Sequence, residues 1–187
     1  VFNFDARNLT GFAFAAMIAS LAVIPVVMSE QAATPSIDNS EHITLRELAR
    51  VVPTGFGTIL LVGLAHGGML GMAVIYATRE GLSIGRTGVL VAVIQLGGMA
   101  LTWPISSASD DIDRRIIGLL ITLGAIVMSI VMLYQPADSI WTIVLLFVIG
   151  GLSFPLYAIA SAYTNDWVSP EQMGSAASQL VTLYGFG

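Results

Sequence analysis

The side chain with the clearest chemical potential is His66, which lies near the middle of a long apolar run. An ionisable residue in apolar surroundings is costly, so it usually faces a cavity or a polar partner. Because histidine titrates near neutral pH, His66 can bind a solute or relay a proton. The alternative is a neutral ring hydrogen-bonded to a neighbouring helix. Gly63, Gly67 and Gly71 have the small-xxx-small spacing of closely packed helices, or mark a helix that opens beside a binding site.

A second set of polar side chains, Ser153, Tyr157 and Ser161, recurs every four residues and therefore shares one face of a helix. Pro155 lies within that stretch and frees backbone carbonyls. A polar stripe beside a proline kink predicts a cavity wall, and the alternative is a polar seam against another helix. Together with His66, these three residues are the candidates for a substrate cavity.

Charge is concentrated in one predicted turn between two apolar runs. It holds three carboxylates and two guanidiniums: Asp110, Asp111, Asp113, Arg114 and Arg115. Such a turn either fixes helix ends through ion pairs and helix dipoles, or is an ordinary solvated turn with Asp113 as an N-cap. The carboxylates lack the glycine turn and the distal glutamate of a calcium loop, so no metal site is expected.

Other chemistry is missing from the sequence. There is no cysteine, which excludes disulfides and zinc–thiolate sites, and there is no nucleophile–base or phosphate-loop motif. Twelve acidic residues outnumber seven arginines, which argues against a nucleic-acid partner. Gln95 and Gln179 lie inside apolar runs, where interhelical hydrogen bonds are their expected role. We therefore predict no enzymatic activity, no cofactor and no metal.

Membrane helices are the elements expected to position these residues. The 187 residues are 56% hydrophobic and 10% charged, whereas soluble domains carry about 25% charged residues. A helix needs about 20 apolar residues to cross the hydrocarbon core. Five runs qualify and a sixth begins: 11–29, 54–78, 85–106, 115–134, 140–163 and 173–187. Since lipid forces backbone groups to bond internally and no period-two alternation is present, the expected fold class is all-α, a polytopic transmembrane helix bundle.

The connections are short except for residues 30–53, a long polar linker. Thr44 and Glu47 have the spacing of a capping box and open a short amphipathic helix at 45–52. That helix lies either on the membrane surface or in an ordinary loop. Residues 169–172, Ser-Pro-Glu-Gln, are typical of a helix start.

Arginine placement predicts the orientation. Alternation of the spans puts loops 30–53, 107–114 and 164–172 on one side, with four arginines against three on the other. The positive-inside rule therefore favours the first side as cytoplasmic. The sequence begins without methionine and stops inside an apolar run, so we expect a fragment of a longer protein.

Three segments resemble the major facilitator superfamily of transporters. "WPISSASDDIDRR" is similar to the loop between helices 8 and 9, the second copy of the family's G-x-x-x-D-R-x-x-R-R motif, and Asp110, Asp113, Arg114 and Arg115 match it. "GLAHGGMLGMAVIYATREGLS" resembles helix 7 of the YcaD-like branch, with His66 where that branch has Asn. "GGLSFPLYAIASAYTNDWVSPEQMGSAASQLVTLYGFG" resembles helix 10, the next loop and the start of helix 11.

The resemblance implies a domain organisation. Residues 1–29 would be the last helix of the N-terminal half, 30–53 the cytoplasmic inter-half linker, and 54–187 the truncated C-terminal-half bundle. Helices 7 and 10 would line the central cavity, which places His66 and the polar stripe near the solute. Helices 8 and 11 would meet the other half, and helices 6 and 9 would face lipid. Asp110 would engage a helix end of the missing half and hold one alternating-access state.

We therefore expect part of a secondary active transporter that moves a small solute by alternating access, as a multi-pass protein of the inner or plasma membrane. Its partners would be the lipid bilayer, the missing helices of the same transporter and an unidentified small-molecule substrate. The alternatives are a non-transporting scaffold or sensor on the same fold and an intramembrane enzyme. A scaffold would fill the space between helices 7 and 10 with apolar side chains and satisfy His66 entirely with protein groups.

Overall fold

The computed structural model describes residues 10–21, 23–28, 41–137 and 139–187. Every regular element in these ranges is an α-helix, which confirms the all-α class. The chain separates into two units, Val1–Asn39 and Ser40–Gly187, and each is described by itself. Residues 29–40, which include much of the predicted linker, lie outside the described residues.

The first unit holds α1, Thr10–Leu21, and α2, Ile24–Val27. The predicted single span at 11–29 is therefore wrong as one continuous helix. Pro25 contributes to the break, because it has no N–H to donate to the carbonyl of Leu21. At 12 residues, α1 is shorter than the roughly 20 needed to cross the hydrocarbon core.

The second unit contains the predicted spans from 54 onward. Four helical stretches are long and apolar enough to cross a membrane: α4, Pro53–Arg79; α5, Ile84–Asp111; α6, Arg114–Met132; and α7–α8, Ile140–Asn165. The last consists of α7, Ile140–Ser153, and α8, Pro155–Asn165. Two shorter helices accompany them: α3, Leu45–Val51, and α9, Met173–Gly185. Helices thus occupy all four of the predicted runs from 54 to 163: 54–78, 85–106, 115–134 and 140–163.

Helix ends differ from the sequence prediction in three places. The predicted turn at 107–114 is shorter than expected, because α5 continues to Asp111 and Asp113 caps α6 by accepting from the Arg115 N–H at 2.8 Å. The stretch 140–163 divides at Phe154, immediately before Pro155. Residues 169–172 form a turn closed by a bond from the Gln172 N–H to the Ser169 carbonyl, and α9 starts only at Met173.

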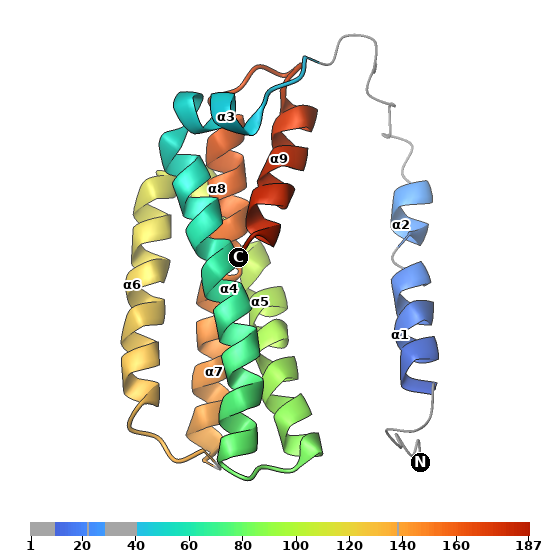
Figure 1. Ribbon diagram of the computed structural model, residues 1–187, viewed down its shortest axis with the longest axis vertical. Helices are drawn as coiled ribbons and strands as arrows, with labels where there is room; N and C mark the ends of the chain where they lie inside the picture. The colour runs from blue at the N-terminus through green and yellow to red at the C-terminus, as the bar shows by residue number, and fades with distance from the viewer. Residues whose placement is uncertain (1–9, 22, 29–40, 138) are drawn as a thin grey trace. The chain divides into compact units, whose positions relative to one another are not determined.

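In the second unit, α4, α5, α6 and α7–α8 run along a common direction, and α3 lies across one end (Figure 1). We call this the linker end. The closest packing is between α5 and α7, where a side chain on Gly97 would meet the carbonyl of Phe147 and one on Gly150 would meet the backbone of Ile94. Glycines at both positions let the two backbones approach closely, as small residues do in membrane helix pairs.

The apolar face of α3 is buried in protein. Leu48 and Val52 are almost fully buried in a cluster with Ile43 and the α9 residues Ala176 and Leu180. The Ile43 N–H donates to Ser175 Oγ at 3.1 Å, which also ties this segment to α9. The amphipathic face predicted for 45–52 therefore packs on the bundle, which leaves Arg46 and Arg50 exposed.

The capping box that opens α3 makes its stability depend on acid pH. The Glu47 carboxylate accepts from the Thr44 N–H and hydroxyl, both at 2.8 Å, and these bonds lower the pKa of Glu47 below its ordinary value of 4.5. A lowered pKa means that the stabilisation is present above about pH 4.5 and is lost as the pH falls through the folded-state pKa. We expect hydrogen-exchange protection of the Leu48 amide, corrected for intrinsic rates, to fall in that acid range. Glu47→Gln should remove this pH dependence, and an unchanged acid profile in the variant would contradict the assignment.

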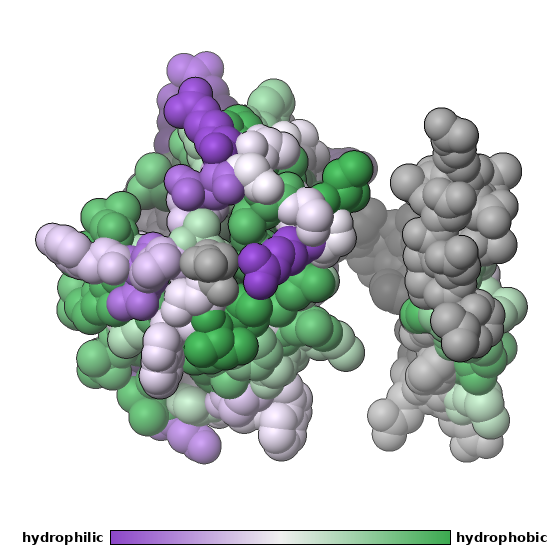
Figure 2. Space-filling view, turned by 90° about the horizontal axis from the view of Figure 1, so that it is seen from below, coloured by the Kyte–Doolittle hydropathy of each residue, from purple (hydrophilic) through white to green (hydrophobic). Residues whose placement is uncertain are grey.

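The outer surface of the second unit is apolar. On α6 only Ile121 is buried, while exposed side chains such as Leu119, Leu123, Ile126 and Ile130 cover the helix. Seen from the end opposite α3, hydrophobic residues make up much of the outline (Figure 2). Exposed apolar surface on this scale is typical of a bundle whose solvent is lipid or further helices.

Candidate functional site

His66 lies where three helices meet. It is 2% exposed on α4, and its Nδ1 is 2.9 Å from the Tyr184 hydroxyl of α9 while its Nε2 is 2.9 Å from Ser153 Oγ at the end of α7. The imidazole also stacks on Phe154, with ring centroids 4.4 Å apart. Both ring nitrogens are therefore satisfied by protein hydroxyls, each of which can donate or accept. We call His66, Ser153, Phe154 and Tyr184 the His66 junction.

The glycines around His66 explain how α9 comes so close. A side chain at Gly63 would meet the carbonyl of Tyr184, and one at Gly67 would meet the carbonyl of Gly187, whereas Gly71 has open space beside it. Gly63 and Gly67 thus serve the close helix packing that the small-xxx-small spacing predicts. Their close contact positions the Tyr184 ring beside the imidazole.

The predicted polar stripe divides between two environments. Ser153 belongs to the His66 junction, and Tyr157 packs against the Tyr184 ring of the junction, with the two ring centroids 5.0 Å apart in an edge-on arrangement. Ser161 is half-buried farther along α8. The residues keep their shared direction because Phe154, between α7 and α8, retains helical backbone angles. A cavity role for the stripe remains a prediction.

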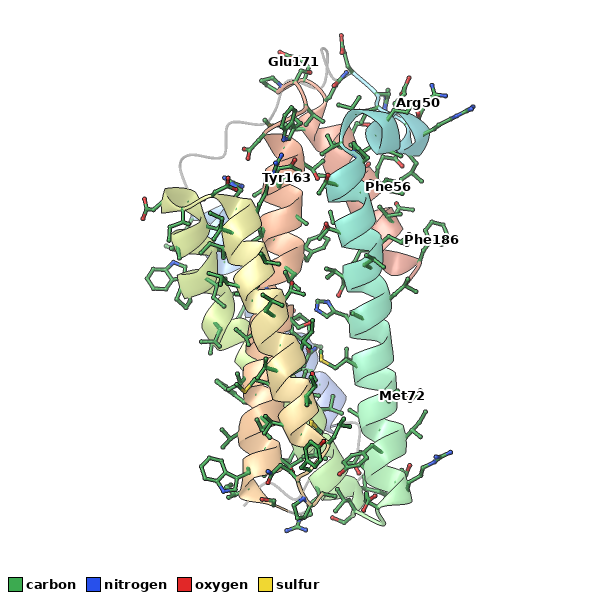
Figure 3. All side chains as sticks on the ribbon, turned by 90° about the vertical axis from the view of Figure 1, so that its left-hand side faces the viewer. Arg50, Phe56, Met72, Tyr163, Glu171 and Phe186 are labelled. Carbon is green, nitrogen blue, oxygen red and sulfur yellow. The ribbon has the colours of Figure 1, made fainter. Side chains whose placement is uncertain are left out.

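A cluster of charges joins α5, α6 and α8 at the linker end. Arg114 bridges two carboxylates, with its Nη2 3.5 Å from Asp110 and its Nε 3.5 Å from Asp166. Arg115 donates to the Tyr163 hydroxyl at 2.6 Å, and its guanidinium lies 5.2 Å from the centre of the Tyr163 ring. Tyr163 is labelled at this end of the bundle in Figure 3. We call these five residues the ionic cluster. They show that the charged segment connects helix ends within the second unit.

Two hollows flank the ionic cluster. One, of about 450 Å³, is lined by the cluster itself with Ser109, Asp111 and Asp113. The other, of about 370 Å³, opens between α4, α6 and α8 and is lined by Thr54, Thr58, Thr122 and mostly apolar groups. Neither includes any of the four residues proposed from the sequence as a substrate cavity. Within the described residues, no group of three His, Asp or Glu side chains is placed to hold a metal ion.

The two mid-span glutamines have no interhelical bond in the described part of the chain. Gln95 is exposed on α5 and Gln179 is half-buried on α9. Their predicted role as interhelical polar contacts stays a prediction, since exposed faces of these helices are free to meet other parts of the protein.

Several residues of the two sites do not stand out in the sequence. Tyr184 and Phe154 look like ordinary apolar-run aromatics, although a hydroxyl deep in such a run is a signal for a polar partner. Asp166 and Tyr163 carry a clearer signal, because they end a span on the side of the bundle where Arg114 and Arg115 begin another.

Comparison with known proteins identifies the family of the chain. A family model described as Major Facilitator Superfamily matches residues 7–187. The chain is similar to the MFS-type transporter YcaD of Escherichia fergusonii, with 27% identity over 71% of this chain and 34% of the relative. It is similar to YcaD of Escherichia coli O139:H28, with 27% identity over 80% of this chain and 38% of the relative. The chain thus spans little more than a third of the curated relatives it matches. No solved structure matches it.

Proposed function

Because the chain belongs to the Major Facilitator Superfamily, we propose that its full-length protein is a secondary active transporter that moves a small solute across the membrane by alternating access. The observation that carries the proposal is the family match over residues 7–187, together with four apolar helices long enough to span a bilayer. The inner or plasma membrane is the proposed location, with the linker end on the cytoplasmic side. Arg46, Arg50, Arg114 and Arg115 at that end support this orientation.

The same assignment divides the chain. We propose that residues 1–29 close the N-terminal half, that 30–53 link the halves and that 54–187 form most of the C-terminal half. In this scheme α4 and α7–α8 are helices 7 and 10, and the stripe Ser153, Tyr157 and Ser161 borders the solute path. Few charged residues occur along these helices, which supports a neutral or amphipathic solute.

The ionic cluster supports a mechanism in which this half moves as a unit. Arg114 ties the α5–α6 turn to the segment after α8, so the cytoplasmic ends of three helices are held together. Alternating access by rocking of two halves requires such internally rigid bodies. The exposed apolar faces of α5 and α6 then belong to contacts with lipid or with the remaining helices.

Alternating access can be tested by cysteine accessibility, since the 187 residues contain no cysteine. The full-length protein, with any cysteine outside this chain replaced by serine, would carry a single cysteine at Ser161. In oriented vesicles, we expect a membrane-impermeant thiol reagent to label this residue from one side or the other, with solute shifting the balance. A cysteine at lipid-exposed Ile126 is the matched control and should not respond to solute. Labelling of Ser161→Cys that no transported solute alters would contradict the proposal.

The second candidate is a non-transporting scaffold or sensor on the same fold. One observation favours it: His66 is satisfied by protein groups, as a scaffold requires. Solute counterflow in proteoliposomes separates the two, because a transporter exchanges labelled for unlabelled solute with saturation and a scaffold does not. The absence of counterflow across a broad panel of neutral, cationic and anionic solutes would favour the scaffold.

A further inference from the structure

The His66 junction coincides with a break in a long helix. Ser153 is the last residue of α7, Phe154 separates the two helices, and Pro155 is the first residue of α8. Pro155 has no N–H to donate to the carbonyl of Gly151, so the ladder of backbone bonds is interrupted at this turn. Such interruptions are where helices bend. The α7–α8 junction is therefore a place where a change of helix angle requires little loss of backbone bonding, as is Pro104 inside α5. Of these two prolines, only Pro155 directly follows two residues that His66 contacts.

His66 contacts the last residue of α7 and the residue that separates the two helices. Its Nε2 bonds to Ser153 and its ring stacks on Phe154, while its Nδ1 bonds to Tyr184 of α9. One imidazole thus joins the break in α7–α8 to two neighbouring helices. We infer that His66 is a positioning residue that fastens the α7–α8 hinge to α4 and α9 and so sets the hinge angle.

The same contacts make His66 a poor direct ligand for a solute. Both nitrogens are occupied and the side chain is 2% exposed, so a solute would have to displace Ser153 or Tyr184 to reach it. The two hydrogen bonds of His66 can act as a latch, by which we mean contacts that favour one hinge angle without preventing another. Interhelical side-chain bonds in membranes are modest, and two of them together shift a two-state equilibrium roughly tenfold. A latch of this strength holds one conformation without preventing the other.

The inference predicts a geometric effect that requires no solute. Spin labels on cysteines at Trp141 and Trp167, which are exposed near the two ends of α7–α8, report the angle across the hinge. In the full-length protein, with any cysteine outside this chain replaced by serine, we expect one dominant distance. His66→Leu should add a second, resolved distance population, because the hinge loses both bonds while an apolar side chain still fills the site.

Conservative variants test whether the hydrogen bonds of His66 or only its packing set the hinge angle. His66→Gln can donate one hydrogen bond and accept another, so it should restore the single distance. Tyr184→Phe and Ser153→Ala each remove one bond and should give intermediate populations, which also keeps the inference testable if His66→Leu does not fold. His42→Leu, at the other and exposed histidine, is the control and should leave the distance unchanged.

The distance distributions of these variants decide whether His66 acts as a latch. Equal distributions for wild type, Tyr184→Phe and Ser153→Ala would overturn the latch, as would a Gln variant that behaves like the Leu variant in folded protein. The transport consequence rests on the proposed function, and solute counterflow of the same variants measures it separately. A hinge that responds in a protein without counterflow would support the latch and overturn only the proposed transport.

Discussion

Gly97→Val should greatly reduce the yield of folded protein. A side chain at residue 97 on α5 would overlap the carbonyl oxygen of Phe147 on α7, and the clash is with backbone that cannot swing aside. Overpacking of well-packed positions typically costs about 1–3 kcal/mol and occasionally more, and a clash with backbone leaves no side chain that can move to reduce it. Natural proteins are stable by only about 5–15 kcal/mol, so the loss is a large part of the total. The yield of monodisperse full-length protein after detergent extraction would measure it.

A glycine on the same helix provides the control for Gly97. Gly88 also lies in α5, and a side chain built there would meet nothing within 4 Å in the described residues. Gly97→Ala should lower the melting temperature in detergent clearly, while Gly88→Ala should leave it unchanged or raise it, because alanine favours the helix more than glycine. Equal melting temperatures for these two alanine variants would show that the α5–α7 backbones are not in close contact.

The partner position strengthens the Gly97 prediction. A side chain on Gly150 would meet the backbone of Ile94, one turn away from Gly97, so both sides of the α5–α7 contact depend on glycine. If a single close contact is responsible, Gly97→Ala and Gly150→Ala together should destabilise less than the sum of the two, since the first substitution already separates the helices. Strict additivity would point to two independent clashes.

The four long spans of the second unit were predictable because lipid imposes one rule on every residue of a span. An apolar run of sufficient length must satisfy its backbone internally, so hydropathy alone predicts the helices that begin at Pro53, Ile84, Arg114 and Ile140. Hydropathy does not predict where a helix ends. It marks the edge of the hydrocarbon core, and the backbone can continue as a helix beyond that edge, in water. The last turn of α5 is such a case, where the Ser109 hydroxyl bonds back to the Ser106 carbonyl inside a polar segment.

The site was predictable only in part, because tertiary contacts depend on how helices rotate and how deep they sit. His66 and Ser153 stand out as polar groups in apolar runs, and the structure joins them. Nothing local fixes which residue of α9 faces His66. The contact with Tyr184 depends on the close approach of α4 and α9 at Gly63, which is a tertiary feature. By contrast, the pairing of Arg114 with Asp166 follows from topology, since α6 begins at Arg114 and α8 ends next to Asp166 at the same end of the bundle.

If the full-length protein transports as proposed, Arg114→Gln should slow its solute exchange by about tenfold while leaving the protein folded. Arg114 bridges Asp110 and Asp166, whose side chains are 71% and 54% exposed, so each pair contributes only about 0.2–1 kcal/mol to stability. If both pairs form in only one of the two alternating states, their loss shifts the balance between states by up to about thirtyfold. A small effect on stability and a large effect on exchange are therefore expected from one substitution.

Double substitutions identify the pairs responsible. Asp166→Asn in the Arg114→Gln background should add little further loss, because the ion pair is already broken, and a double-mutant cycle measures this coupling. Asp111→Asn is the matched control, since the carboxylate of Asp111 has no ion pair in the described part of the chain although it follows Asp110 directly. It should leave exchange near wild type and its effect should add to that of Arg114→Gln.

Ionic strength provides an independent check on the Arg114 prediction. Screening shortens the reach of exposed charges, with a Debye length of about 8 Å at physiological salt and about 3 Å at 1 M. Raising salt should therefore reduce the exchange rate of wild type toward that of Arg114→Gln and leave the variant unaffected. If the two proteins respond equally to salt, the rate is controlled by other charges, and the ionic cluster does not stabilise one of the alternating states.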